Sequence, residues 1–599
     1  MPESRTETVR RRELAAAAVG DWITAYPIVR PLAAGELREY DSRKPSGGWR
    51  LEVQFPDRMR RLDLLLPDGF PRRPPQVALV DRPKFMTWPH VDEDGVLCLL
   101  GDHAEIDFTR PVEVASTLLS SAAELVGELV LTGRPEDFRA EFNTYWNRTV
   151  PPRRPKVYSL LSPVERSRIV RVWRGRGFDL IGEQAETDPW LRNRFTSKVD
   201  TRSEAAAVVW LPRPLLPDEF PSKPVRVFQL AGQVGAGPLL ERLVCDEKGE
   251  VVVFAAPTPN GPCFAAVTLA TGRRYGQQAL TPDGPIPGFR PGKAPKPILV
   301  RHLYGDGTAL KSQVERADAP WVHGRGQDPR FGRLRNATVA VLGCGSVGAP
   351  TAIQLAGAGV GGLILVDPET LHWANVGRHP LGAPGVGREK ATALAERIRS
   401  SLPHIRRVED IDGKWPDLGD ETLEKLAECD LIVSAIGNWA AEGALDEWHR
   451  RNRTGPIVYG WTEAHACAGH AVAIFPARGC LHCGFFPDGT PKIRVTNWPA
   501  ESTLKQEPAC GATYQPYGPI ELGHIVSLLA ETALDCLLGT ITTSVRRTWV
   551  GRRALLDGAG GAWNPDWLAR SGGHQIGGFV EEAAWPREPH CVECGRPAT

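Results

Sequence analysis

A glycine-rich turn between a predicted strand and a predicted helix places the strongest constraint on the fold of this chain. The segment GCGSVG, residues 343–348, follows the apolar strand 337–343 and opens an alanine-rich helix. Glycines allow a tight turn and close approach of a phosphate, and the helix start supplies unpaired N–H groups and a positive dipole end. Asp367 ends the next strand, where a carboxylate can hold ribose hydroxyls. The pattern predicts a nucleotide site that includes Gly343, Gly345, Gly348 and Asp367.

The alternation of elements around this turn predicts the fold of the C-terminal part. From about residue 301 onward, strands such as 361–367 and 429–437 alternate with helices such as 389–402. Further apolar strands follow at 455–461 and 470–476. Alternation of this kind is typical of α/β domains with a parallel, doubly wound, Rossmann-like sheet.

The identity of the nucleotide stays open on the glycine turn alone, for which NAD or FAD is the default. Asn375, Arg378 and Lys390 follow Asp367 closely. A fixed arginine and lysine beside a pyrophosphate suit a reaction that develops negative charge on transferring phosphates. A dehydrogenase needs no such pair, so these residues favour ATP. On spacing alone, solvated surface charge stays an equal alternative.

Composition limits the class of protein. A chain of 599 residues allows about four domains. The formal net charge of +1 gives no reason to expect a nucleic-acid partner. We find no uninterrupted apolar run long enough to cross a membrane, and no signal-peptide pattern at the start. The 12 cysteines are widely spaced, which indicates a reducing, cytoplasmic setting in which thiols serve metals or chemistry.

The regions before residue 301 differ in how much they reveal. Residues 1–150 mix predicted helices with strands at 49–56 and 61–67 and a proline-rich turn, which indicates an α+β domain. A stiff PPRRP break follows at 151–155. Residues 155–300 contain strands and loops but no chemical motif, so the fold of this middle domain stays unassigned.

Two C-x-x-C pairs, each followed by glycine, predict a metal site. Two such knuckles complete a closed tetrahedral zinc site. Their wide separation weakens the argument from spacing, and free buried cysteines or a redox pair stay open. The candidate ligands are Cys480, Cys483, Cys591 and Cys594.

The C-terminal region resembles the adenylating domain of ubiquitin-activating-like enzymes of the ThiF and MoeB type. The resemblance rests on the glycine turn with Asp367, Asn375, Arg378 and Lys390. It implies that the C-terminal carboxylate of a small protein attacks the α-phosphate of ATP to form an acyl-adenylate. Asp367 would then bind the ribose, and the other three residues would contact phosphates. The same pairs of cysteines occur in the bacterial members, which favours zinc, and these domains typically form homodimers.

The chain departs from the family's pattern at one position where the family usually binds magnesium. Gly437, followed by Asn438, stands where the family usually has an acid for magnesium, so the Mg ligands stay unassigned. A second family feature is a cysteine that accepts the activated carboxylate as a thioester. Cys510 lies in the corresponding polar segment, just before a predicted helix that starts near Pro519. A thiolate is favoured at such a helix start.

The N-terminal region resembles ubiquitin-conjugating enzymes. The resemblance implies that Cys98 receives an acyl group by transthioesterification and passes it to an amine. The family's His-Pro-Asn triplet reads His90-Val91-Asp92 here, so the asparagine thought to stabilise the oxyanion is absent. Asp92, a neighbour or the backbone remain as substitutes. The matching positions are Phe70, Pro71, Pro74, Pro75, His90, Gly95, Cys98 and Leu99.

This order of domains resembles bacterial fusion enzymes of CBASS antiphage operons, encoded beside cyclic-oligonucleotide synthases (CD-NTases). The domains would be 1–150, conjugating-like; 155–300, unassigned; and 301–599, adenylating. The resemblance implies a relay from ATP to Cys510, then Cys98, then a target amine, with a CD-NTase or a ubiquitin-like protein as the activated partner. A sulfur-carrier adenylyltransferase, a non-catalytic scaffold and a dehydrogenase are the alternatives.

Overall fold

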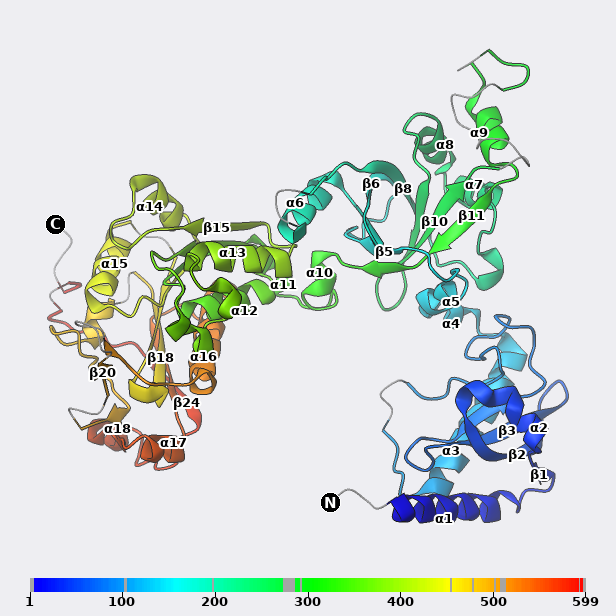
Figure 1. Ribbon diagram of the computed structural model, residues 1–599, viewed down its shortest axis with the longest axis horizontal. Helices are drawn as coiled ribbons and strands as arrows, with labels where there is room; N and C mark the ends of the chain where they lie inside the picture. The colour runs from blue at the N-terminus through cyan, green and yellow to red at the C-terminus, as the bar shows by residue number, and fades with distance from the viewer. Residues whose placement is uncertain are drawn as a thin grey trace. The chain divides into compact units, whose positions relative to one another are not determined.

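The computed structural model describes residues 5–101, 105–195, 199–272, 286–290, 293–452, 455–476, 479–499, 503–506, 513–591 and 593–595 (Figure 1). The chain divides into two compact units. The first comprises residues 1–158, 163–181 and 203–315, and the second comprises 159–162, 182–202 and 316–599.

The first unit begins with a four-stranded antiparallel sheet in the order β1-β2-β3-β4. Alternate residues of β3, such as Leu62 and Leu64, are fully buried in a core shared with α1 and α3. This is the α+β arrangement that the sequence predicts. The elements are α1 (Arg5–Ile23), β1 (Val29–Pro31), α2 (Ala34–Leu37), η1 (Arg38–Arg43), β2 (Pro45–Gln54), β3 (Met59–Pro67), β4 (Gln76–Leu79), α3 (Pro111–Thr132), α4 (Pro135–Ala140) and α5 (Phe142–Arg148).

Helix α3 is, among the described residues, the one helix long and apolar enough to cross a membrane by length and composition. The sequence expectation considered only uninterrupted apolar runs and therefore passed over it. Leu118, Leu125 and Leu129 of α3 are buried in the core beneath the sheet. The apolar face of α3 thus belongs to the core of this domain.

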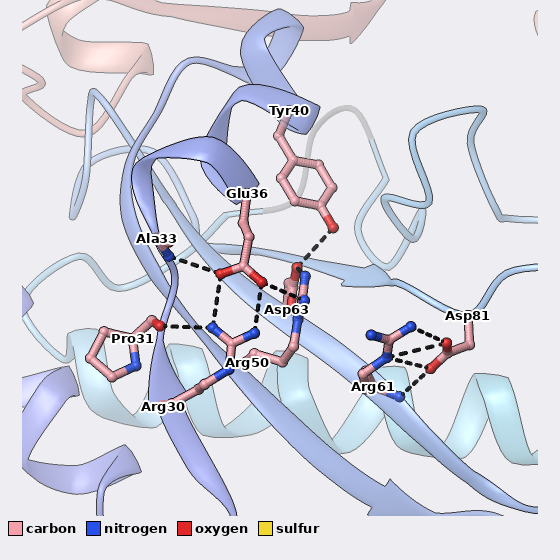
Figure 2. A network of polar contacts seen from close by, with 9 residues as sticks. All are labelled: Arg30, Pro31, Ala33, Glu36, Tyr40, Arg50, Arg61, Asp63 and Asp81. Carbon is pink, nitrogen blue, oxygen red and sulfur yellow. Dashed lines mark hydrogen bonds and ion pairs between the residues drawn. The ribbon is translucent and has the colours of Figure 1, made fainter.

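The opposite face of the sheet holds a buried network of charges (Figure 2). Arg50 of β2 donates to both carboxylate oxygens of Asp63 on β3, each at 2.7 Å, and the Tyr40 hydroxyl donates to Asp63 at 2.9 Å. Glu36 lies between Arg30 and Arg50 and accepts from Arg50 at 2.6 Å. Asp63 is fully buried and Arg50 nearly so. Two layers of structure, the sheet and the α2–η1 segment, therefore depend on one arginine.

Replacing Arg50 should destabilise this domain strongly. In Arg50→Met the Asp63 carboxylate stays buried without its cation, and breaking such a pair costs about 3–5 kcal/mol. Hydrogen exchange of the β3 amides measures this loss locally. Arg61→Met is the matched control because Arg61 pairs with Asp81 nearby while its own side chain is 44% exposed (Figure 2). The loss of stability in Arg61→Met should stay below about 1 kcal/mol. Equal losses in the two variants would contradict the role assigned to Arg50.

The remainder of the first unit is an eight-stranded sheet in the order β11-β10-β9-β8-β6-β7-β5-β12, for which the sequence offered no fold. Strands β8 and β9 pair in parallel, whereas β6 with β8, β9 with β10 and β10 with β11 pair antiparallel. Helices α7, α8 and α9 bury apolar side chains in its core, which also takes Phe142 and Trp146 of α5. The elements are β5 (Lys156–Ser159), β6 (Arg168–Arg174), β7 (Phe178–Gly182), β8 (Glu204–Trp210), η2 (Pro217–Glu219), α7 (Pro224–Gln233), α8 (Gly237–Cys245), β9 (Val251–Ala256), β10 (Cys263–Ala270), α9 (Lys296–Tyr304), β11 (Thr308–Ser312) and β12 (Val314–Arg316).

The second unit is built on a sheet in the order β15-β14-β13-β16-β17-β18-β22-β24. Apolar residues of β13 and β14 alternate between the two faces, with α12, α13 and α16 on one and α14 and α15 on the other. The doubly wound, Rossmann-like fold is therefore confirmed. The first elements are α6 (Gln184–Phe195), α10 (Ala319–Val322), α11 (Phe331–Asn336), β13 (Thr338–Leu342), α12 (Gly348–Gly357), β14 (Gly362–Val366), η3 (Trp373–Arg378), η4 (Ala383–Gly385), α13 (Lys390–Ser401), β15 (Arg407–Ile411), α14 (Asp420–Ala427), β16 (Leu431–Ser434), α15 (Trp439–Asn452) and β17 (Ile457–Thr462).

The prediction of a parallel sheet is wrong for its second half. The strands from β15 to β17 pair in parallel, but β17, β18, β22 and β24 pair antiparallel. Only a short segment containing η5 joins β17 to β18, which is too short for the crossover that parallel strands need. The remaining elements are η5 (Ala464–Ala466), β18 (Ala468–Ile474), η6 (Leu481–Gly484), β19 (Thr496–Asn497), β20 (Lys505–Gln506), β21 (Thr513–Tyr514), α16 (Pro519–Leu538), β22 (Val545–Val550), α17 (Arg553–Gly558), β23 (Ala562–Trp563), α18 (Pro565–Arg570) and β24 (Phe579–Ala584).

Candidate functional site

A pocket of about 620 Å³ opens at the carboxyl ends of β13, β14 and β16 in the second unit. Open α/β sheets bind ligands at this edge. The predicted residues Gly343, Gly345, Asp367 and Lys390 all line it, together with Gly437. A volume of this size is in the range of small-molecule sites. The sequence pattern therefore brings these residues into one cavity, as a nucleotide site requires.

Asp367 organises the floor of this pocket. Its carboxylate accepts the Cys344 N–H at 2.6 Å and the Glu369 N–H at 2.8 Å, which ties the glycine turn to the end of β14. Burial raises the pKa of Asp367, and these two backbone N–H groups oppose the rise. Lys390, at the start of α13, is buried to 5% exposure and pairs with Glu369. A fixed cation thus stands beside the acid that would hold a ribose.

His379 contacts the glycine turn of this site, and the sequence analysis did not single it out. Its Nε2 lies 2.8 Å from the Cys344 carbonyl, and the Leu381 N–H bonds Nδ1. Burial lowers the pKa of His379, which favours the neutral ring. A single histidine after Arg378 carried little signal in the sequence. Its partner is a backbone carbonyl of the glycine turn, and only the fold brings the two together.

Asn375 and Arg378 lie outside the lining of the pocket. Asn375, in η3, accepts the His372 N–H through its side chain. The Arg378 guanidinium lies 5.2 Å from the ring centre of Tyr517, whose hydroxyl is 3.3 Å from that of Ser346 in the glycine turn. Arg378 is therefore linked to the turn through Tyr517. Gly348 also does not line the pocket, since it begins α12 behind the turn.

A buried acid lies behind the position where the resemblance expects a magnesium ligand. Gly437 lines the pocket, and a side chain there would meet open space. Glu442 of α15 accepts from the Ser434 hydroxyl at 3.1 Å and from the Gly437 N–H at 3.4 Å. Burial raises the pKa of Glu442 to about 7. The acid thus holds the loop after β16 but does not line the pocket.

The raised pKa of Glu442 predicts a pH dependence of stability. The folded state keeps the proton up to about pH 7, whereas an unfolded glutamate loses it near 4.5. Stability should therefore fall as the pH rises from about 4.5 to about 7, by roughly 3 kcal/mol. Glu442→Gln, which is neutral at every pH, should differ least from the wild type at about pH 4, below the unfolded pKa of 4.5, and exceed it at about pH 7.5. Protection of the β16 amides, compared between the two proteins at equal pH, measures the difference. Glu421→Gln, with an 85% exposed side chain, is the control and should change little; equal stability of Glu442→Gln and wild type at pH 7.5 would contradict the assignment.

Cys98 is exposed and lies on the segment that follows the four-stranded sheet of the first unit. Its N–H donates to the His90 carbonyl at 2.9 Å, and Val91 and Leu97 form an antiparallel bridge. Gly95 turns the loop with φ of +90°, where any added side chain would lie 2.5 Å from the Leu79 carbonyl oxygen. The loop therefore presents Cys98 at the base of a tight, backbone-bonded hairpin. Of the residues predicted around it, Phe70 is buried and Leu99 packs against the core.

Asp92 does not fit the role of the missing asparagine. Its carboxylate lies 2.5 Å from both the Arg43 and the Arg148 guanidinium groups. An ionised carboxylate accepts hydrogen bonds only and repels an oxyanion. Asp92 instead ties η1 and α5 to the hairpin that carries Cys98.

The four predicted cysteine ligands converge at one point of the second unit. Sγ of Cys480 lies 3.7 Å from that of Cys483 and 3.5 Å from that of Cys591, and Cys483 lies 3.4 Å from Cys594. Tetrahedral zinc with Zn–S bonds of 2.3 Å needs sulfur atoms about 3.8 Å apart. The cluster therefore fits a closed metal site that pins the C-terminal tail to η6.

Cys510 lies outside the described residues, so its surroundings are not part of the geometry above. The helix predicted to follow it is confirmed, since α16 begins at Pro519.

Comparison with known proteins identifies two families in the chain. Residues 324–559 match the ThiF family, and residues 26–154 match the prokaryotic E2 family B. The chain therefore combines a ThiF-family domain with a domain of prokaryotic E2 family B, the two kinds of domain that the sequence resembles.

Individual relatives cover the chain to different extents. The ATP-dependent ubiquitin transferase-like protein Cap2 of Pseudomonas aeruginosa (strain BWHPSA011 / Pa011) is 25% identical over 514 residues, 80% of this chain and 86% of that protein. Ubiquitin-like modifier-activating enzyme 5 of Drosophila mojavensis is 29% identical over 237 residues, and the chain spans 56% of that relative's length. Among solved structures, E. coli MccB with MccA-N7isoASN is 19% identical over 45% of this chain and 69% of that chain, with a TM-score of 0.32.

Proposed function

We propose that the protein activates the C-terminus of a partner protein as an acyl-adenylate, using ATP, and passes it to Cys510, then Cys98, then a target amine. One observation carries the proposal. A single chain holds a pocket lined by the glycine turn, Asp367 and Lys390, and also an exposed Cys98 on an E2-family domain. The first feature suits activation of a carboxylate, and the second suits its transfer.

The chemistry of each step balances with the groups present. A carboxylate oxygen of the partner attacks the α-phosphate of ATP, and pyrophosphate leaves. The positive charges of Lys390 and Arg378 oppose the charge that develops on the phosphates. The Cys510 thiolate then attacks the acyl carbon and releases AMP, and the Cys98 thiolate displaces that of Cys510. An amine finally attacks the Cys98 thioester, so that an amide forms and the thiol is released.

Two residues that line the pocket fit such a nucleotide: Asp367 would hold the ribose, and Lys390 would contact phosphates. Arg378 and Asn375 lie outside the lining, and their contact with phosphates is what the family resemblance implies. Magnesium would accompany the phosphates, and its protein ligands stay unassigned because Gly437 carries no carboxylate.

For the partner we propose a CD-NTase in CBASS antiphage defence. This choice rests on the order of domains, which resembles that of the fusion enzymes of CBASS operons. The alignment with the ubiquitin transferase-like protein Cap2, which covers most of both chains, supports the shared architecture. A ubiquitin-like protein is the second candidate, favoured by the matches to ubiquitin-like modifier-activating enzyme 5. We further propose three functional domains, 1–150, 155–300 and 301–599, and a cytoplasmic homodimer.

Blocking the last thiol tests the relay. With ATP and a CD-NTase supplied as the proposed partner, Cys98→Ala should accumulate a DTT-sensitive adduct on Cys510 and form no conjugates, because the acyl group cannot move on. Non-reducing gels and mass spectrometry of the adduct measure this, and Cys245→Ala, at the end of α8, is the matched control for Cys98→Ala. Conjugates made at full yield by Cys98→Ala would refute the relay.

Lys390→Ala should lower ATP–pyrophosphate exchange by about 100-fold or more.

A second test concerns zinc, which we propose as the occupant of the four-cysteine cluster. The purified protein should contain about one zinc per chain by elemental analysis, and Cys591→Ser should lower that content sharply because a closed site needs all four thiolates. Chelation should also make the C-terminal tail sensitive to protease. Cys536→Ser, on α16 and outside the cluster, should keep the metal. A wild-type protein without zinc would show that the thiols serve another purpose.

A further inference from the structure

The structure places a tyrosine hydroxyl at the hairpin that carries Cys98. Tyr145 lies on α5. In the sequence it is far from the residues that match those of a conjugating enzyme. Its hydroxyl accepts the His90 N–H at 2.9 Å, while the His90 carbonyl accepts the Cys98 N–H at 2.9 Å. The backbone N–H and carbonyl of His90 therefore connect the Tyr145 hydroxyl to the backbone of Cys98.

The hydrogen bonds of the Tyr145 hydroxyl indicate that it can act as a hydrogen-bond donor. In the part of the chain that the structure describes, the Tyr145 hydroxyl accepts the His90 N–H and donates to no protein acceptor. Burial raises the pKa of Tyr145 to about 12, against the opposing effect of the His90 N–H, and negative charge on Cys98 raises it as well. The phenol is thus neutral at physiological pH and feels the charge at Cys98.

The helix that carries Tyr145 is fixed from its other side. Trp146 is fully buried in the core of the eight-stranded sheet, and its Nε1 donates to the Ser312 carbonyl at 3.0 Å. Phe142 packs in the same core. Donors held in place before the reaction stabilise a developing charge without reorganising. The anchoring of α5 supplies that condition.

We propose that Tyr145 is a catalytic residue of the Cys98 site, whose hydroxyl donates to the oxyanion formed at the acyl carbon when a thioester is made or broken on Cys98. This assignment rests on the proposed function. The amine attacks the thioester carbon, the carbonyl oxygen becomes an oxyanion, and collapse expels the Cys98 thiolate. The amine's proton passes to solvent, and the tyrosine keeps its own proton throughout. Tyr145 thus fills the place left by the absent asparagine, which the acid Asp92 does not.

The test compares two reactions of the same thiol in the full-length protein. A fluorescein-labelled glycyl thioester of 2-mercaptoethanesulfonate acylates Cys98 directly, without ATP or a partner, through a carbonyl oxyanion. Iodoacetamide alkylates Cys98 by displacement at an sp³ carbon, where no carbonyl oxyanion forms. Cys98→Ala gives the background of both. Tyr145→Phe removes only the hydroxyl, so acylation and discharge to hydroxylamine should fall by about 100-fold or more, while alkylation should keep its rate.

The control and the contrary results separate this assignment from the proposed function. Tyr304→Phe removes another buried hydroxyl in the same unit, one whose pKa burial also raises to about 12, and should leave both reactions unchanged. Equal slowing of acylation and alkylation in Tyr145→Phe would show that Tyr145 only positions the thiol and would overturn the assignment. Unchanged acylation would overturn it as well. A wild-type protein that takes no acyl group on Cys98 would contradict the proposed function itself, and this assignment with it.

Discussion

The pocket at the carboxyl ends of β13, β14 and β16 depends on the close approach of backbone segments at the glycine turn. Gly343 has a φ of +87°, and a side chain on it would lie 2.6 Å from the Ala435 carbonyl oxygen. A side chain on Gly348 would lie 1.9 Å from the Gly343 carbonyl oxygen. Strand β13, its turn, helix α12 and the end of β16 therefore meet without room for a methyl group. Because the turn is held so tightly, the Cys344 N–H reaches Asp367, and the floor of the pocket takes its shape from that bond.

In the first unit, the corresponding constraint is helix α5, which packs in the core of the eight-stranded sheet and also contacts the hairpin that carries Cys98. One side of it buries Trp146 among the strands of the larger sheet, while Tyr145 and Arg148 reach the hairpin of Cys98 through His90 and Asp92. Any displacement of α5 therefore moves groups on both sides at once. A middle region without a chemical motif thereby contributes to the site, because it holds in place a helix that the site uses.

The sequence could predict those parts of the molecule whose signal is local. The glycine turn, Asp367 and Lys390 were predicted together and line one pocket, because a strand, a turn and the next strand bring them to the same sheet edge. The four cysteines converge as predicted. The C-x-x-C spacing brings two thiols together within each pair, whereas the meeting of the two distant pairs was favoured by the family resemblance. Spacing alone did not show that Tyr517 would link Arg378 to the turn.

What the sequence could not predict depends on contacts between distant segments. The antiparallel pairing of β18 with β22, and of β22 with β24, joins strands that are separated by other elements. Tyr145 carries no motif and acquires its environment from the hairpin of His90, 55 residues away in the sequence. The eight-stranded sheet lacked a signal for the same reason, since its long-range pairings leave no periodic mark beyond apolar runs.

The glycine at position 437 shows why a single missing motif residue says little about a site. A side chain there would meet open space, but the φ of +69° is one that residues other than glycine rarely adopt. Glu442 lies behind the loop, where burial raises its pKa to about 7. Magnesium in nucleotide sites is bound through one or two carboxylates together with the substrate's own phosphates. With Asp367 engaged by two backbone N–H groups and Glu369 paired with Lys390, the walls offer the ion little on their own. On the proposed function, the phosphates of ATP would therefore supply most of the ligands of a magnesium ion.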